Sequence, residues 1–144
     1  MGGANTEKLK AVCHRHGIGL VYLFGSQAHL GLAMLAGERH AAGDPLSDLD
    51  VGVVTNSPLP APNERAGFYA GLYNDLEEIF RPLRLDLSLL EENHAVFQYE
   101  AIKGYCIFYA DPKKKEDYEM MVLRRAADFR PFLAKYLEEV LEEV

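Results

Sequence analysis

The sequence predicts a single α/β domain spanning residues 1–144, in which helices alternate with about four strands. Four short apolar runs bounded by glycine, proline or polar residues are typical of buried strands. Between them lie segments with apolar residues three and four positions apart, the spacing of an amphipathic helix. A chain of 144 residues with 49% hydrophobic content fits one domain with a genuine core.

We expect nine elements in this order: a helix over 6–16, a strand over 18–24, a helix beginning at Ser26, a strand over 49–55, a helix over 63–80, a strand over 83–90, a helix over 92–103, a strand over 105–109, and a long helix from about 113 to the C-terminus. Thr6 is the expected N-cap of the first helix, and Gly17 and Gly104 end helices. The proline-rich segment 56–62 is a predicted loop. Pro131 is expected to break or kink the last helix.

Charge and composition exclude several classes of protein. The net charge of −7 and the predicted isoelectric point of about 5.2 argue against nucleic acid as the main partner. No apolar run approaches the ~20 residues that cross a bilayer, and the N-terminus lacks the features of a signal peptide. Cys13 and Cys106 lie far apart without a metal-ligand spacing, which favours free thiols in a reducing cytoplasm.

Three aspartates in or beside strand-like runs are the most informative residues. Asp48 and Asp50 are two positions apart, so on a strand their side chains share one face. Asp86 lies within a run of leucines on a later strand. An ionised carboxylate in such a setting must be paired or bound to a metal, and oxygen ligands suit Mg²⁺. Gly25 and Ser26 end an earlier strand and offer backbone N–H groups for phosphate.

Each of these residues also has a purely structural interpretation. Gly25 could be only a turn residue and Ser26 only a helix N-cap. Asp48 could cap a loop, and Asp50 could be a charge on an edge strand. Asp86 is harder to explain in this way because leucines flank it on both sides. For the three acids together we predict a metal site.

A family resemblance supports this prediction. The ordered segments LFGS, SDLDVGVV and LDLSLL resemble the minimal nucleotidyltransferases of the DNA polymerase β-like superfamily. The tail AIKGYCIFYADPKKKEDYEMMVLRRAADFRPFLAKYL resembles the prokaryotic subgroup paired with HEPN-domain toxins. The resemblance extends from about Leu20 to Tyr136. It implies the nucleotidyltransferase fold, with a small mixed sheet flanked by helices and a long C-terminal helix packed across it.

The resemblance also implies an activity. Asp48, Asp50 and Asp86 would be catalytic and would hold two Mg²⁺ ions, and Gly25 and Ser26 would contact the phosphates of ATP. The reaction would move AMP from ATP to a hydroxyl acceptor. The implied acceptor is a tyrosine on a HEPN-domain toxin, which gives the chain an antitoxin role.

Two departures from the family pattern concern nucleotide binding. The family often carries an arginine shortly after Gly-Ser, whereas this chain has Gln27, Ala28 and His29. His29 could replace the phosphate contact or could simply be an exposed helix residue. The segment 30–43 resembles an insertion that lengthens the helix and ends near the active site. Its apolar residues would pack on the core or form a partner surface: Leu30, Leu32, Met34 and Leu35.

Two alternatives to a protein-modifying enzyme stay open. The first is a binding module that neutralises its partner by contact through the C-terminal helix, which carries several apolar residues: Met120, Met121, Leu123, Phe129, Phe132, Leu133, Leu137 and Leu141. The second is a small-molecule nucleotidyltransferase of the antibiotic-modifying type. A homo-oligomer could supply the additional substrate-binding region that such enzymes have.

Overall fold

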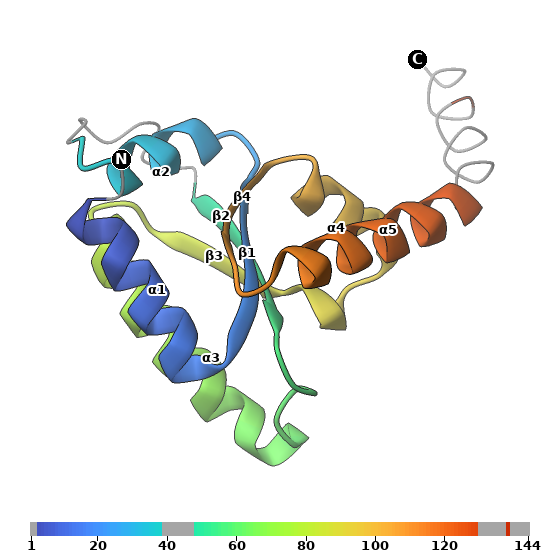
Figure 1. The fold of residues 1–144 in the computed structure, drawn as a ribbon, viewed down its shortest axis with the longest axis horizontal. Helices are drawn as coiled ribbons and strands as arrows, with labels where there is room; N and C mark the ends of the chain where they lie inside the picture. Colours follow the sequence, from blue (N-terminus) through green and yellow to red (C-terminus); the bar gives the residue numbers. More distant parts are fainter. Residues whose placement is uncertain (1–2, 39–47, 130–137, 139–144) are drawn as a thin grey trace.

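The computed structural model of the chain describes residues 3–38, 48–129 and 138 (Figure 1). In chain order its elements are α1 (Ala4–His16), β1 (Ile18–Phe24), α2 (Ala28–Leu35), β2 (Leu49–Thr55), α3 (Pro62–Phe80), β3 (Leu85–Leu89), the 3-10 helix η1 (Leu90–Glu92), α4 (Ala95–Ile102), β4 (Tyr105–Tyr109) and α5 (Pro112–Asp128). None of the described helices is long and apolar enough to cross a membrane.

The four strands form one mixed sheet in the order β3-β2-β1-β4. Strand β1 is antiparallel to both β2 and β4, whereas β2 and β3 are parallel. Every residue of β1 is buried, as expected for a continuous apolar run in the middle of a sheet. The predicted α/β architecture with a small mixed sheet and a long C-terminal helix is therefore confirmed.

Helices cover both faces of the sheet. In Figure 1, α1 and α3 lie on one side of the strands, and α4 and α5 lie on the other. Alternate residues of β2 face the two sides, so Leu49, Val51 and Val53 belong to the core under α1–α3. Val54 belongs to the core under α4 and α5, and Asp50 lies on the same side of β2 as Val54. The face beneath α4 and α5 is thus the face that carries the acids.

Several predicted boundaries are wrong by a few residues. Helix α1 begins at Ala4 with Gly3 at the N-cap, so Thr6 is not its cap. Strand β3 is shorter than predicted, and the helix predicted over 92–103 begins only at Ala95, as α4, after the short helix η1. Asn93 separates these two helices, with φ −106° and ψ 155°, and its Nδ2 donates to Leu89 O at 2.9 Å. This local side-chain bond stabilises a non-helical backbone at Asn93.

The first half of the predicted insertion packs on the core. Leu35 is buried, and Leu30, Leu32 and Met34 lie against the core under α1–α3. Gly31 allows close packing of α2 on the sheet, because a Cβ there would lie 2.9 Å from Leu23 Cδ1. Of the two roles that the sequence left open for these apolar residues, the structure gives them the core role. The remainder of the insertion, from residue 39, lies outside the described residues.

Helix α5 is fixed to the sheet by buried polar contacts. The hydroxyl of Tyr22, a fully buried residue of β1, donates to Glu119 Oε2 at 2.7 Å. Glu119 also forms an ion pair with Lys115 at 3.2 Å. A second link joins α5 to α4, since the Tyr118 hydroxyl donates to Gln98 Oε1 at 2.7 Å. These contacts place α5 across the second face of the sheet.

The apolar residues of the C-terminal helix divide into two groups. Met121 packs against the core under α4 and α5. Met120, Leu123 and Phe129 are 44%, 45% and 42% exposed. Pro131 and the predicted apolar residues beyond it lie outside the described residues.

Candidate active site

The sheet brings two of the three predicted acids side by side. Asp50 on β2 and Asp86 on β3 are direct register partners in a parallel pair, so their side chains point to the same face. The two carboxyl groups are close enough to share a hydrogen bond when one of them is protonated. Asp48 lies two residues before Asp50, immediately ahead of β2. The end of the sheet therefore carries all three predicted acids.

The surroundings of Asp50 disfavour its charged form. Burial raises the pKa of Asp50 from 3.8 to about 6, and the charges of Asp86 and Asp48 and the hydrogen bond with Asp86 add to the effect. Asp50 is half-buried, whereas Asp86 on the edge strand is exposed. A cation bound between these carboxylates would offset their repulsion, because its positive charge attracts both negative charges.

The turn after β1 lies directly against Asp50. Phe24, the last residue of β1, is the register partner of Asp50, and Gly25 follows with φ +77°. A Cβ at Gly25 would clash with Asp50 Oδ2 and would lie 3.2 Å from its Cγ. Glycine is therefore required twice, for the left-handed backbone and for the close approach to the carboxylate.

Ser26 and His29 lie on the continuation of this turn. The chain bends back through a hydrogen bond from Ala28 N to Gly25 O at 3.3 Å, and α2 begins at Ala28 with Gln27 at its N-cap. The prediction that Ser26 begins the helix is therefore wrong, because the turn uses two more residues. Ser26 and His29 are both exposed. Their predicted roles in nucleotide binding remain predictions.

Sequence reasoning missed Arg84. Its Nε lies 3.4 Å from Asp48 Oδ1, and the two side chains are 70% and 42% exposed. The Asp48 Oδ1 atom is itself buried and accepts no hydrogen bond in the structure. The backbone also connects the two segments, since Leu49 N donates to Arg84 O at 2.8 Å. The available signal was the position of Arg84 directly before the strand that carries Asp86.

The sequence profile of the family described as "Polymerase beta, Nucleotidyltransferase" matches residues 7–113 of the chain. The chain belongs to this nucleotidyltransferase family. The matched region contains the Gly25 turn and all three acids. No curated protein matches the sequence.

Solved structures with a similar fold come from toxin–antitoxin complexes. A chain of a toxin–antitoxin crystal structure with AMP-PNP aligns with a TM-score of 0.64 at 16% identity, over 95% of this chain and 98% of that one. A chain of the structure of a tri-AMPylated Shewanella oneidensis HEPN toxin in complex with MNT antitoxin aligns with a TM-score of 0.61 at 15% identity. The alignment covers 95% of this chain and 96% of that one. At these identities the similarity shows a shared nucleotidyltransferase fold.

The donor set of this nucleotidyltransferase fits a hard divalent cation. Within residues 3–38 and 48–129, no group of three His, Cys, Asp or Glu side chains is already arranged to hold one metal ion. Asp50 and Asp86 nevertheless face each other, and Asp48 Oδ1 is a buried oxygen without a hydrogen-bond donor. All the available ligands are carboxylate oxygens, which suit Mg²⁺.

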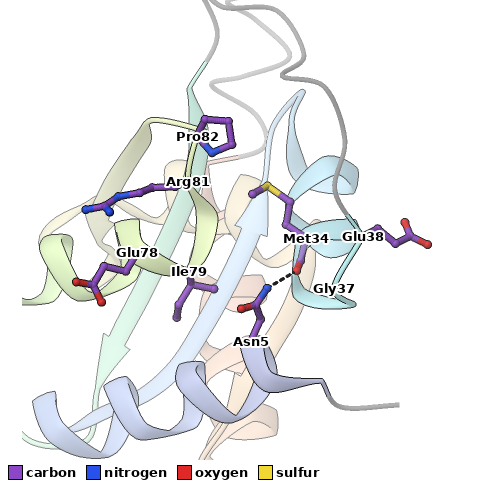
Figure 2. Close-up of a pocket in the computed structure, with 8 residues that line it drawn as sticks. All are labelled: Asn5, Met34, Gly37, Glu38, Glu78, Ile79, Arg81 and Pro82. Carbon is purple, nitrogen blue, oxygen red and sulfur yellow. Dashed lines mark hydrogen bonds between the residues drawn. The ribbon is translucent and has the colours of Figure 1, made fainter.

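Two cavities bear on where a substrate could bind. One, of about 520 Å³, lies between the ends of α1, α2 and α3 and is lined by residues that include Asn5, Met34 and Pro82 (Figure 2). None of the predicted site residues lines it. Another, of about 340 Å³, is lined by Gly25 and Lys103 among others, and so adjoins the turn beside Asp50.

Proposed function

We propose that this nucleotidyltransferase transfers AMP from ATP to a hydroxyl of a partner protein, a tyrosine on a HEPN-domain toxin. The observation that carries the proposal is the arrangement of Asp50, Asp86 and Gly25. Two carboxyl groups face each other on neighbouring strands, and a glycine turn lies against one of them. A structural ion pair would not require two acids in contact, whereas a phosphoryl-transfer site does.

The three aspartates have distinct proposed positions. Asp48, Asp50 and Asp86 would hold two Mg²⁺ ions, which supply positive charge at the attacking and leaving oxygens. Asp86 lies on the edge strand and is exposed, so an acceptor from another protein can reach it. Asp50 is half-buried between β1 and β3 and lies next to the turn. The acceptor side of the site is therefore proposed to be at β3.

The proposed reaction is an in-line displacement. The acceptor oxygen forms a bond to the α-phosphorus of ATP as the bond from that phosphorus to the bridging oxygen breaks, and pyrophosphate leaves. Asp86 accepts the proton of the acceptor hydroxyl. Gly25 leaves room for the phosphates because it has no side chain beside Asp50.

The choice of partner is supported by the structures that share the fold. Their descriptions name toxin–antitoxin complexes, one with AMP-PNP and one with a tri-AMPylated HEPN toxin. The exposed apolar residues of α5 support a protein partner independently. Met120 and Leu123 are exposed on a helix whose other side packs on α4. Exposed apolar side chains grouped on one element are typical of a protein-binding surface.

The same surface supports a second candidate function, neutralisation of the partner by binding alone. In that case α5 would hold the toxin, and the acids would not be needed. The two candidates make different predictions for Asp50→Asn, because this change removes a proposed metal ligand and leaves α5 untouched.

The test is intact-mass spectrometry of a purified HEPN-domain partner after incubation with the chain, ATP and Mg²⁺. The expected result is a gain of one or more AMP masses on the partner. A variant with both Asp48→Asn and Asp50→Asn is the control and should give no mass gain. Asp75→Asn is the matched control and should retain full transfer, because Asp75 is paired with Arg15 at 2.8 Å on α3, on the other side of the sheet (Figure 1).

Three outcomes separate the candidates. Transfer by the unsubstituted chain and not by the double variant supports the enzyme. A stable complex of both proteins without any mass gain supports neutralisation by binding. Equal mass gain with the double variant would contradict the roles of Asp48 and Asp50.

A further inference from the structure

The cavity beside the Gly25 turn is lined by a lysine, Lys103. One wall of this cavity of about 340 Å³ is formed by Phe24, Gly25 and Ala28, from the end of β1 to the start of α2. The facing wall is formed by the end of α4 and the start of β4, including Lys103 and Tyr105. The cavity thus connects the turn that touches Asp50 to a lysine on a different helix.

The cavity lies on the side of the site on which pyrophosphate would leave. Along the sheet the strands lie in the order β3-β2-β1-β4, so Asp86, Asp50 and Gly25 lie on three successive strands or their ends. In an in-line displacement the acceptor and the leaving group lie on opposite sides of the reacting phosphorus. If the acceptor approaches at Asp86 on β3, pyrophosphate departs toward β1 and β4, where the cavity lies.

A polyphosphate in this cavity needs positive charge, and the turn provides little. Helix α2 contains no lysine or arginine. Among the described residues that line the cavity, Lys103 is the one lysine or arginine. Lysine binds phosphate as a flexible point charge at the end of a long side chain.

Lys103 is held near the turn by the packing of Gly104. A Cβ at Gly104 would clash with Leu23 O and would lie 2.8 Å from Phe24 Cβ. Glycine at this position therefore lets the end of α4 lie directly against the end of β1. The backbone of Lys103 cannot move away from the Gly25 turn without breaking this contact.

The ammonium group of Lys103 is available for exchange of partners. Its Nζ lies 3.1 Å from Glu100 Oε1 and 5.1 Å from the centre of the Tyr99 ring, and the lysine side chain is 50% exposed. Both are surface contacts of the kind that contribute little to stability. A polyphosphate carries several negative charges and can replace the single carboxylate.

We propose that Lys103 binds the β- and γ-phosphates of the nucleotide in the cavity between α4 and the Gly25 turn. This inference rests on the proposed nucleotidyl transfer, since it assigns the side of the site on which pyrophosphate leaves. It makes Lys103 a nucleotide-binding residue, one that acts on the triphosphate and not on the acceptor.

The test compares two nucleotides, of which only one carries the β- and γ-phosphates that Lys103 would touch. Calorimetric titration measures the binding of α,β-methylene-ATP and of AMP, each with Mg²⁺, to the unsubstituted chain and to Lys103→Gln. Loss of a charge-assisted contact should weaken binding of the ATP analogue about tenfold and leave AMP binding within about twofold. Lys103→Arg keeps the charge and should bind the analogue within about threefold of the unsubstituted chain.

The matched control is Lys10→Gln. Lys10 forms an ion pair of the same i,i+3 type with Glu7, at 3.5 Å, on α1 across the sheet. This change removes the same charge and should leave both affinities unaltered. A loss of affinity with Lys10→Gln equal to that with Lys103→Gln would show a general charge effect and overturn the proposal.

Three other outcomes would contradict either the role of Lys103 or the proposed function. Equal binding of the ATP analogue by Lys103→Gln and the unsubstituted chain would overturn the role of Lys103 while leaving nucleotidyl transfer intact. Equal losses for AMP and for the analogue would place Lys103 away from the β- and γ-phosphates and overturn it as well. An unsubstituted chain that binds neither nucleotide would instead contradict the proposed function itself.

Discussion

Replacing Asp50 with asparagine should stabilise the metal-free protein while it abolishes transfer. The pKa of Asp50 is raised from 3.8 to about 6, first by burial and then by the neighbouring acids. The folded state therefore binds this proton more tightly than the unfolded chain does. The corresponding stability is present below about pH 4 and is lost as the pH rises through about 6. Asparagine stays neutral and can donate a hydrogen bond to Asp86.

The magnitude follows from the shift. At about 1.36 kcal/mol per pKa unit, a change from 3.8 to about 6 corresponds to at most about 3 kcal/mol. Asp50 is only half-buried, so water screens part of the repulsion and about 1–2 kcal/mol is expected near neutral pH. For a chain of this size that equals a rise in the melting temperature of about 3–6 °C.

The assay is urea unfolding in EDTA, followed by circular dichroism, from about pH 4 to about pH 8. The advantage of Asp50→Asn over the unsubstituted chain should increase from about pH 4 to about pH 6 and stay level above that. Asp117→Asn is the control, because Asp117 is exposed in its ion pair on α5, and it should show no such increase. An advantage of the same size at both ends of the range, or none near neutral pH, would refute the reasoning.

Three further changes follow from the same contacts. Gly25→Ala should destabilise the fold by about 1–3 kcal/mol and abolish nucleotide binding, because φ is +77° and the added Cβ clashes with Asp50. Tyr22→Phe should cost about 1–2 kcal/mol in urea unfolding, since it removes the part-buried hydrogen bond from the Tyr22 hydroxyl to Glu119 of α5. Mg²⁺ at a hundred times its Kd should stabilise the unsubstituted chain by about 2.7 kcal/mol and Asp50→Asn by much less, measured as a shift in melting temperature.

Each of these predictions has a control in the same fold. Gly67→Ala, in the middle of α3 with open space around the added Cβ, should stabilise by about 0.5–1 kcal/mol, opposite to Gly25→Ala. Tyr109→Phe, at a residue 51% exposed, should change stability by less than about 0.5 kcal/mol. A Gly25→Ala protein as stable as its parent, or equal effects at Tyr22 and Tyr109, would contradict the respective arguments. A magnesium effect of equal size in Asp50→Asn would remove Asp50 from the proposed ligands.

Much of the fold could be predicted from local sequence. The apolar runs at 18–24, 49–55 and 105–109 are strands with the predicted bounds. In the two central strands, β1 and β2, burial on both sides leaves a nearly continuous apolar pattern. The helix break at Asn93 was not predicted, since it depends on one side-chain bond to Leu89 O. The start of α2 was misplaced because a turn of positive φ at Gly25 consumes residues that a helix pattern does not reveal.

The sequence by itself determined which residues could carry the chemistry: three aspartates in or beside apolar strands, and a glycine–serine turn. Only the tertiary structure decided which of them meet. The register of β2 against β3 pairs Asp50 with Asp86, and the end of β1 brings Gly25 against Asp50. The fold also brings Arg84 to Asp48 and places Lys103 on the wall of the cavity that Gly25 lines. Residue type and periodicity are local properties of the chain, whereas these contacts depend on strand order and register, which are set by the packing of the whole domain.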